Sequence, residues 1–387
     1  ALQPLLADAD LATLLSMFLL AWSKKDLSQA SFRLFTLPKP SEPEILRTDV
    51  PEADLAEAVT DEYGVKYSPD GLRLLKAPPG LSDSYAIKPG TKVICDWAFL
   101  WCESFANIIF PNSVIRIGNS AFNRCSSLAS ITIPDSVTSI GDGAFRECSS
   151  LTSIAIPDSV THIGDAAFGG CASLTSIVIP DGVTSIGEFA FTDCASLESV
   201  ATSGSMTSIG AKAFKGCESL NDFIIPDGVT RIGAKAFEGC KSLNDIVITD
   251  GVTHIGASAF EECKSMKNII IPESVTQIGI CAFCGCSSLT SVTIPGSVTH
   301  ISAKAFEGCK SLKDVVIQEG VADIDNAFNG CTSLESVTIP DSLSYVNPWA
   351  FTGCDSLADD VLGRLYSCGK EYDEEEYDEE GYVEYDE

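Results

Sequence analysis

Residues 144–166 read AFRECSSLTSIAIPDSVTHIGDA, and this pattern recurs along most of the chain. Its Ala-Phe pair occurs twelve times, with a phenylalanine every 23 residues except for one step of 22. The phenylalanines are Phe99, Phe122, Phe145, Phe168, Phe191, Phe214, Phe237, Phe260, Phe283, Phe306, Phe328 and Phe351. A fixed period of this length is typical of a solenoid in which each repeat forms one coil. The step from Phe306 to Phe328 lacks one glycine, so one coil should be locally tightened there.

Each repeat carries apolar side chains at eight fixed positions, which one 23-residue unit cannot bury by itself. In a stack of identical coils, each phenylalanine, cysteine, leucine and isoleucine lies on its equivalent above and below. The pattern therefore predicts one continuous hydrophobic core shared by about twelve coils.

The order of residues within a repeat predicts two extended segments and one tight turn. Residues 154–156 alternate inward and outward, which indicates a strand, and Pro157 ends it because proline has no N–H for further pairing. Residues 160–163 form a second extended run. Gly164 then permits a bend into the short turn that carries the next Ala-Phe pair.

This repeat resembles the BspA-like (Treponema-type) leucine-rich repeats, which occur in cell-surface proteins of bacteria and some protists. The resemblance covers roughly residues 93–357. It implies a repeat solenoid of leucine-rich-repeat type, a right-handed α/β-type superhelix of about twelve 23-residue coils. The Leu-x-x-Ile-x-Ile strands would form a parallel β-sheet on its concave side. Six positions depart from the pattern, with Ser203, Thr249 and Gln318 in place of proline and Ser302, Asp325 and Asn347 in place of glycine.

The ends of an open stack need caps, and the flanking sequences suggest them. We assign residues 1–60 to an N-terminal helical region, because apolar side chains between Leu11 and Trp22 follow the spacing of one helix face. Two roles are open for this helix, packing on the first coil or docking a partner. Residues 61–92 resemble the family's lead-in hairpin, which forms the next cap.

The solenoid at 93–357 is followed by two further segments. Ser356-Leu357-Ala358-Asp359 has the form of a capping box, which predicts a short cap helix within 358–368. Residues 369–387 form an acidic tail of Tyr, Asp and Glu, whose charge density opposes burial. The tail is either a solvated segment or a site for cations or a basic partner.

Composition excludes several classes of partner. The formal net charge of −29 and the 25 basic residues against 54 acidic ones argue against nucleic acid, which binds to clustered Lys and Arg. The apolar segment from Leu11 to Trp22 is about half the ~20 residues that span a bilayer, so we expect no membrane insertion.

Most of the sixteen cysteines follow the repeat, which favours a structural role over chemistry. Twelve lie three residues after the repeat phenylalanine, at Cys102, Cys125, Cys148, Cys171, Cys194, Cys217, Cys240, Cys263, Cys286, Cys309, Cys331 and Cys354. We expect reduced thiols that act as small buried hydrophobes. Cys281 and Cys284 join Cys286 in a C-x-x-C-x-C run, but Cys284 should point outward, so no metal site is predicted.

No catalytic constellation is apparent, and we expect no enzyme and no cofactor. His162, His254 and His300 share one position in the repeat. At ~4.8 Å per coil they lie about 10 Å or more apart, too far to ligate one metal ion. Ser and Asp recur in every coil as turn and strand residues, and no histidine is placed distinctively against them.

The outward strand positions should form the concave surface. One column reads Asn107, Ser130, Ser153, Ser176, Ser199, Asp222, Asp245, Asn268, Ser291, Asp314, Ser336, and its neighbour Ile109, Thr132, Ala155, Val178, Ala201, Ile224, Val247, Ile270, Thr293, Val316, Thr338. The C-terminal half should be the more acidic and apolar. We therefore predict binding through Asp222, Ile224, Asp245, Val247, Asn268, Ile270, Ser291, Thr293, Asp314 and Val316.

Two functions remain open for this chain. The first is a surface adhesion module, at the cell surface or secreted, that binds a protein or glycan, and the partner should carry basic residues. The second is an intracellular adaptor or structural subunit of a larger complex, which contacts partners through the N-terminal helix or the acidic tail. Many reduced thiols favour the second function.

Overall fold

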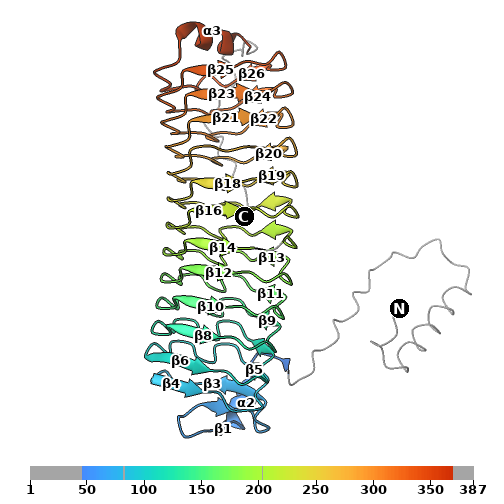
Figure 1. Cartoon of the computed structure of the whole chain (residues 1–387), viewed down its shortest axis with the longest axis vertical. Coiled ribbons are helices and arrows are strands. Elements are labelled where there is room, and N and C mark those ends of the chain that lie inside the picture. Colours follow the sequence, from blue (N-terminus) through green and yellow to red (C-terminus); the bar gives the residue numbers. More distant parts are fainter. Residues whose placement is uncertain (1–45, 82, 203, 369–387) are drawn as a thin grey trace, which may run out of the picture. The chain divides into compact units, whose positions relative to one another are not determined.

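The computed structural model describes residues 46–81, 83–202 and 204–368 (Figure 1). The chain divides into two compact units, residues 1–42 and 43–387, and the description below concerns the second. The predicted helix between Leu11 and Trp22 and the acidic tail at 369–387 lie outside the described residues.

The second unit is a column of stacked coils in which two ladders of short strands run side by side (Figure 1). The first ladder holds β4 (Asp83–Ala86), β6 (Phe105–Ile109), β8 (Ser130–Thr132), β10 (Ser153–Ala155), β12 (Ser176–Val178), β14 (Ser199–Ala201), β16 (Asp222–Ile224), β18 (Asp245–Val247), β21 (Ser291–Ile294), β23 (Asp314–Ile317) and β25 (Ser336–Thr338). Its strands pair in parallel, and equivalent residues of consecutive coils are partners, as with Ser153 and Ser130.

The second ladder is built from the other extended segment of each coil. It holds β3 (Arg73–Lys76), β5 (Val93–Ile94), β7 (Arg116–Ile117), β9 (Ser139–Ile140), β11 (His162–Ile163), β13 (Ser185–Ile186), β15 (Ser208–Ile209), β17 (Arg231–Ile232), β19 (His254–Ile255), β20 (Gln277–Ile278), β22 (His300–Ile301), β24 (Asp323–Ile324) and β26 (Tyr345–Val346). The expected parallel-strand repeat solenoid is confirmed. Among the described residues, helix is confined to α2 (Glu52–Ala56) and α3 (Asp359–Ser367), at the two ends.

The third side of each coil, which carries the Ala-Phe pair, is a run of turns that is hydrogen-bonded to the next coil. Along this run, some backbone N–H groups donate to a carbonyl of the same turn and others donate to a carbonyl of the next coil. Phe168 N donates to Ala190 O at 2.9 Å, whereas Cys171 N donates to Phe168 O at 3.1 Å. The alternation needs left-handed residues, and Ala166 has a φ of 52°. In this coil every N–H from Gly164 to Leu174 has a partner, so no buried donor is left unpaired.

The repeat phenylalanines form one stack through the centre of the column. Consecutive rings lie 4.9–5.5 Å apart with interplanar angles of 15° or less. Phe306 and Phe328, which flank the 22-residue step, are 5.4 Å apart, like the others. The missing residue is absorbed in the turn, because Lys304 has a φ of 59° but its equivalent Asn326 is not left-handed.

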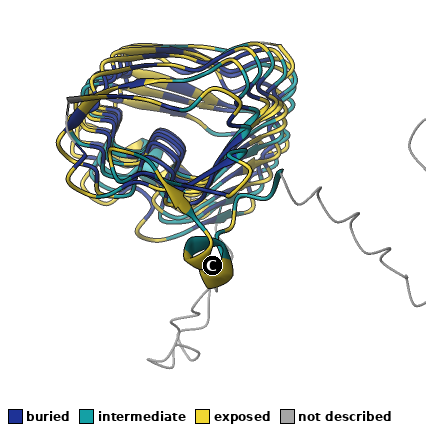
Figure 2. Cartoon of the chain, turned by 90° about the horizontal axis from the view of Figure 1, so that it is seen from below, coloured by how far each residue is buried: buried dark blue, intermediate teal, exposed yellow. Residues whose placement is uncertain are grey.

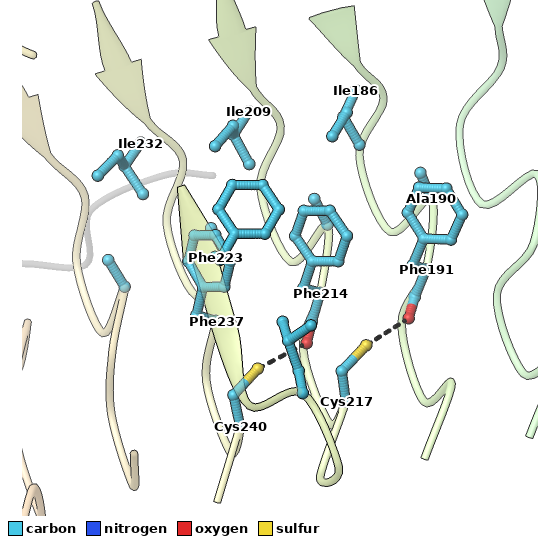
Figure 3. Packing of buried hydrophobic residues seen from close by; sticks show 14 of the residues in the cluster. Ile186, Ala190, Phe191, Ile209, Phe214, Cys217, Phe223, Ile232, Phe237 and Cys240 are labelled. Atoms are coloured by element: carbon cyan, nitrogen blue, oxygen red, sulfur yellow. Dashed lines mark hydrogen bonds between the residues drawn. The ribbon is translucent and has the colours of Figure 1, made fainter. Parts of the chain in front are cut away.

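The ladder cysteines do more than fill space beside the rings. Cys217 Sγ donates to Phe191 O at 3.1 Å and Cys240 Sγ to Phe214 O at 3.2 Å (Figure 3). The same bond to the preceding coil recurs from Cys125 to Cys354 at 3.1–3.3 Å. Each phenylalanine carbonyl from Phe99 to Phe328 thereby gains a second donor, which requires a protonated thiol.

Antiparallel strands and α2 cover the N-terminal end. β1 (Val59–Thr60) pairs with β2 (Lys66–Tyr67), and β2 pairs with β3, so the antiparallel part begins two residues before residue 61. The buried Tyr67 and Tyr85 hydroxyls lie 2.6 Å apart, and Tyr85 donates to Asp61 at 2.6 Å. This hydrogen-bonded chain satisfies polar groups where the core is closed.

Helix α3 covers the C-terminal end but begins differently from the sequence expectation. Leu365 is buried in the core, so the helix closes the last coil. The predicted capping box is wrong, because the N-cap residue is Ala358 and makes no side-chain cap bond. Ser356 Oγ instead donates to Thr332 O of the preceding coil at 2.8 Å.

Coils approach closely at the glycine that follows the second strand in most repeats. A Cβ on Gly233 would lie 2.5 Å from Gly210 C. We predict that Gly233→Ala lowers the free energy of unfolding by about 1–3 kcal/mol, the usual range for overpacking. Gly363→Ala is the control, because no heavy atom lies within 4 Å of its Cβ. Equal thermal midpoints for the two variants would contradict close packing at Gly233.

Burial of the ladder thiols predicts steep alkaline unfolding. Burial raises the pKa of Cys102 to about 11, and it raises the pKa of Cys171 and Cys286 well above the ordinary range. Unfolded thiols ionise near ~8.5, so their stabilisation is complete below that pH. Each such thiol removes about 1.4 kcal/mol per pH unit as the pH rises toward its folded pKa. Circular dichroism should show unfolding above pH ~9, and Cys171→Ala with Cys286→Ala should move the midpoint upward.

Candidate binding surface

The outward side chains of the first ladder form one surface, which we call the strand face. All ten residues predicted for binding are exposed, and they alternate with buried neighbours. Figure 2 shows buried and exposed segments alternating along the coils. The apolar members are unusually open, with Ile224 70% exposed and Ile270 80% exposed. Exposed branched side chains in a row are candidates for contact with a partner.

Strand pairing brings most of these residues into neighbouring positions. Asp222 is the partner of Asp245, and Ile224 the partner of Val247. Farther along, Asn268 bridges to Ser291, Ser291 pairs with Asp314, and Thr293 pairs with Val316. The ten residues therefore lie in two groups, because no strand pairing joins residues 245–247 to 268–270 among the described residues.

The carboxylates on this face make no ion pair with a described Lys or Arg. Asp245 accepts a hydrogen bond from Asn244 Nδ2 at 3.0 Å, and Asp314 accepts one from Ser336 Oγ at 2.7 Å. The ion pairs of the described coils lie elsewhere, such as that of Lys215 with Glu238 at 3.1 Å. The strand face therefore presents acidic groups beside apolar ones.

A recess of about 420 Å³ opens on the strand face between β14 and β16. It is lined by Val200, Ala201, Thr202, Gly204, Asp222, Phe223, Ile224, Ile225, Pro226 and Asp227. A second recess of about 310 Å³ lies between β6 and β8 and has no carboxylate in its lining, which includes Asn107, Ile109, Phe110 and Thr132. Only the first recess contains residues predicted for binding.

Sequence reasoning missed an ordered feature on the turn side. Asn119 N donates to Asp96 Oδ1 at 2.7 Å, and Asp142 N donates to Asn119 Oδ1 at 2.9 Å. Two further steps extend this ladder through Asp165 to Glu188. The signal in the sequence was an Asp or Asn that recurs two residues before the Ala-Phe pair. Its role is structural, because its side chain holds the backbone of the next coil.

Two tryptophans on the first coil were also missed. Trp97 is 54% exposed and Trp101 48% exposed. The Arg124 guanidinium lies 4.1 Å from the Trp101 ring centroid, and its Nε lies 2.7 Å from Glu147. The stacked cation covers part of one indole, as expected for a cation–π contact.

The C-x-x-C-x-C run divides between core and surface. Cys286 is buried and donates to Phe260 O at 3.2 Å, as a ladder member. Cys284, expected to point outward, is half-buried instead, and burial raises its pKa to about 12. Among the residues that the structure describes, no group of three or more His, Cys, Asp or Glu side chains is placed to hold a metal ion.

The three histidines are separated, as the repeat spacing required. His254 pairs with Arg231 on one side and Gln277 on the other, and His300 pairs with Asp323. His162 pairs with Ser139. No histidine is the strand partner of another within the described ladders. No helix in the described part of the chain is both long and apolar enough to cross a membrane.

The coils of 23 residues stack through parallel strand ladders, and most carry a leucine at the same position of the repeat. These features define a leucine-rich-repeat solenoid. The chain belongs to the family of the BspA type leucine rich repeat region, whose model matches residues 92–221, 207–327 and 325–362. Proteins of this fold and family are generally non-enzymatic binding scaffolds. No relative was found among proteins of curated function.

Two solved bacterial structures are similar over most of the chain. A leucine-rich cell surface protein from Faecalibacterium prausnitzii A2-165 is 29% identical with a TM-score of 0.55, and the match covers 82% of this chain and 98% of that chain. A leucine-rich repeat protein from Bacteroides ovatus ATCC 8483 is 25% identical with a TM-score of 0.53, and the match covers 80% of this chain and 85% of that chain.

The thiol geometry predicts that the ladder cysteines carry no disulfides. In denaturant without reductant, a thiol reagent should titrate all sixteen cysteines. In the native protein the buried ladder members should react far more slowly than Cys281, Cys284 and Cys368, which are partly exposed. Titration of eight or fewer thiols in denaturant would mean that the ladder is cross-linked.

Proposed function

We propose that this protein is a binding scaffold that contacts a partner protein through the strand face of its C-terminal half. The observation that carries the proposal is the row of exposed apolar side chains, Ile224, Val247 and Ile270, beside carboxylates without ion pairs. Apolar contact supplies affinity, and complementary charge supplies steering and register. The partner should therefore present apolar and basic side chains together.

A protein is favoured over a glycan as the partner. Branched aliphatic side chains such as Ile270, 80% exposed, bury best against other apolar side chains. Asp222 and Asp245 call for cations, which lysine and arginine supply and a neutral sugar does not. The backbone beneath these residues is held by neighbouring coils, so little conformational freedom is lost on binding.

We place this activity at the cell surface. The support is the similarity to the leucine-rich cell surface protein of Faecalibacterium prausnitzii, which is 29% identical. The alternative is an intracellular adaptor, and one observation favours it. A thiol that donates to the preceding phenylalanine carbonyl, as Cys217 does at 3.1 Å, is maintained most readily in a reducing compartment.

A charge-reversal experiment tests the strand face. Peptides are selected on the full chain from a phage-displayed random library, and we expect enrichment of sequences that combine Lys or Arg with bulky apolar residues. Substitution of Asp222, Asp245 and Asp314 together by Lys should weaken the selected peptides at least tenfold without unfolding the column, because all three side chains are exposed.

The matched control makes the same charge change elsewhere on the repeat. Asp135, Asp158 and Asp181 are exposed turn residues, and their replacement by Lys should change affinity by less than threefold. An equal loss of peptide affinity in both triple variants would mean that binding depends only on the net charge of the protein. Binding that survives the strand-face change but disappears when residues 371–387 are deleted would identify the acidic tail as the site.

A further inference from the structure

The recess between β14 and β16 arises where one coil departs from the repeat. The position that holds a buried isoleucine in neighbouring coils, Ile179 and Ile225, is Thr202 in this coil. Gly204 stands where the turn aspartate occurs elsewhere, as at Asp158. Thr202 and Gly204 both line the recess, and these two shorter residues leave its space unfilled.

The strand ladder also opens at this point. β14 pairs with β12, and β16 pairs with β18, but no strand pairing joins β14 to β16 among the described residues. The two coils remain bonded on either side of the opening, where Asn221 N donates to Glu198 O at 3.3 Å and Thr230 N to Thr207 O at 3.1 Å. The opening is thus bounded at both ends.

The recess lies above a rigid aromatic base. Phe223 lines it but is only 2% exposed, because its ring packs between Phe214 and Phe237, each at a centroid distance of 5.1 Å (Figure 3). Phenylalanine at this inward position occurs in this coil alone among the repeats of 144–362, where isoleucine or valine is usual. The surface here is therefore preformed and does not depend on movement of the base.

The rim combines apolar and anionic groups. Ile224 is 70% exposed on one side. Asp222 and Asp227 are exposed lining residues, and neither forms an ion pair with a described Lys or Arg. An apolar hollow beside two uncompensated carboxylates is complementary to an apolar side chain with a cation next to it.

We propose that this recess is the anchor site for a partner protein, and that it takes one bulky apolar side chain flanked by lysine or arginine. The inference rests on the proposed function and deepens it. The apolar side chain fills the space left by Thr202, against Phe223 and Ile224, and the flanking cations pair with Asp222 and Asp227. Such central, desolvated pockets concentrate binding energy in one side chain.

The neutral recess between β6 and β8 serves as an internal comparison. It has a similar volume, about 310 Å³, and its lining includes Ile131. Because its lining holds no carboxylate, it should not select a cation-flanked side chain. Ile109 also lines a neighbouring hollow that contains Asp61 and Glu62, whereas Ile131 does not. Isoleucine methyl resonances at Ile224 and Ile131 therefore report on the two recesses separately within one full-length protein.

The experiment is a methyl NMR titration with the amide-capped peptide Ser-Lys-Phe-Lys-Ser. We expect saturable shifts of the Ile224 methyl and little change at Ile131. Replacement of the peptide's Phe by Gly, or of its Lys residues by Glu, should weaken binding at least tenfold. Equal saturable shifts at both isoleucines, or no dependence on the peptide's Phe or Lys, would overturn the proposal.

Filling and neutralising variants complete the test. Thr202→Ile restores the usual repeat residue, so it should keep or raise the thermal midpoint and weaken the peptide at least tenfold. Thr132→Ile, which fills the neutral recess, should leave binding unchanged. D222N with D227N should weaken binding three- to tenfold without altering the base of the recess. Unchanged affinity in both Thr202→Ile and the double Asn variant would exclude the recess.

The outcome also separates this inference from the proposed function. If phage-selected peptides lose affinity on the Asp222, Asp245 and Asp314 reversal but not on Thr202→Ile, the strand face binds and the recess is not its anchor. If the Lys-Phe-Lys peptide binds at Ile224 while the charge reversal leaves selected peptides unaffected, the recess holds and the broader surface proposal fails.

Discussion

The structure depends on one constraint, which is that every side chain of the repeat must lie on its equivalent in the next coil. The phenylalanine rings follow this constraint, because the centroids of consecutive rings lie 4.9–5.5 Å apart. The cysteine thiols stabilise the stacking by donating to the phenylalanine carbonyl of the preceding coil. A change in one coil therefore acts on its two neighbours. The missing residue before Phe328 shows this, since the ring spacing is kept and only the turn at Asn326 changes.

This constraint leaves the outward positions free to vary, and that freedom is what a binding scaffold needs. Ile224, Val247 and Ile270 are exposed although the backbone beneath them is held by the stack. Their exposure costs stability that burial of the same side chains would provide. Contact with a partner is a physical reason for a row of exposed apolar side chains on an acidic protein. The recess that Ile224 lines is one place in that row where a partner side chain can enter.

The same cysteine position serves both packing and hydrogen bonding. Valine or alanine would fill part of the space beside the phenylalanine ring, but neither could donate to the Phe191 carbonyl as Cys217 does. Serine could donate, but its hydroxyl is costlier to bury. A thiol is weakly polar and small, which fits both demands. In the described coils, carboxylates such as Asp158 and Asp222 lie on turns and outward strand positions, where they can contact a partner and do not enter the core.

The sequence alone was sufficient to predict the features that repeat with the 23-residue period. The number of coils, the inward and outward strand positions, the buried cysteine ladder and the separation of His254 from His300 all follow from counting, because each coil has the same length and phase. Features that depend on distances between neighbouring coils came only from the tertiary structure. Ser356 was read as a helix cap, but it bonds to Thr332 of the coil below. The thiol bonds, the Asp96–Glu188 ladder and the recess at Thr202 likewise arise between coils, where the gap left by one side chain is set by its neighbours and not by its own position in the sequence.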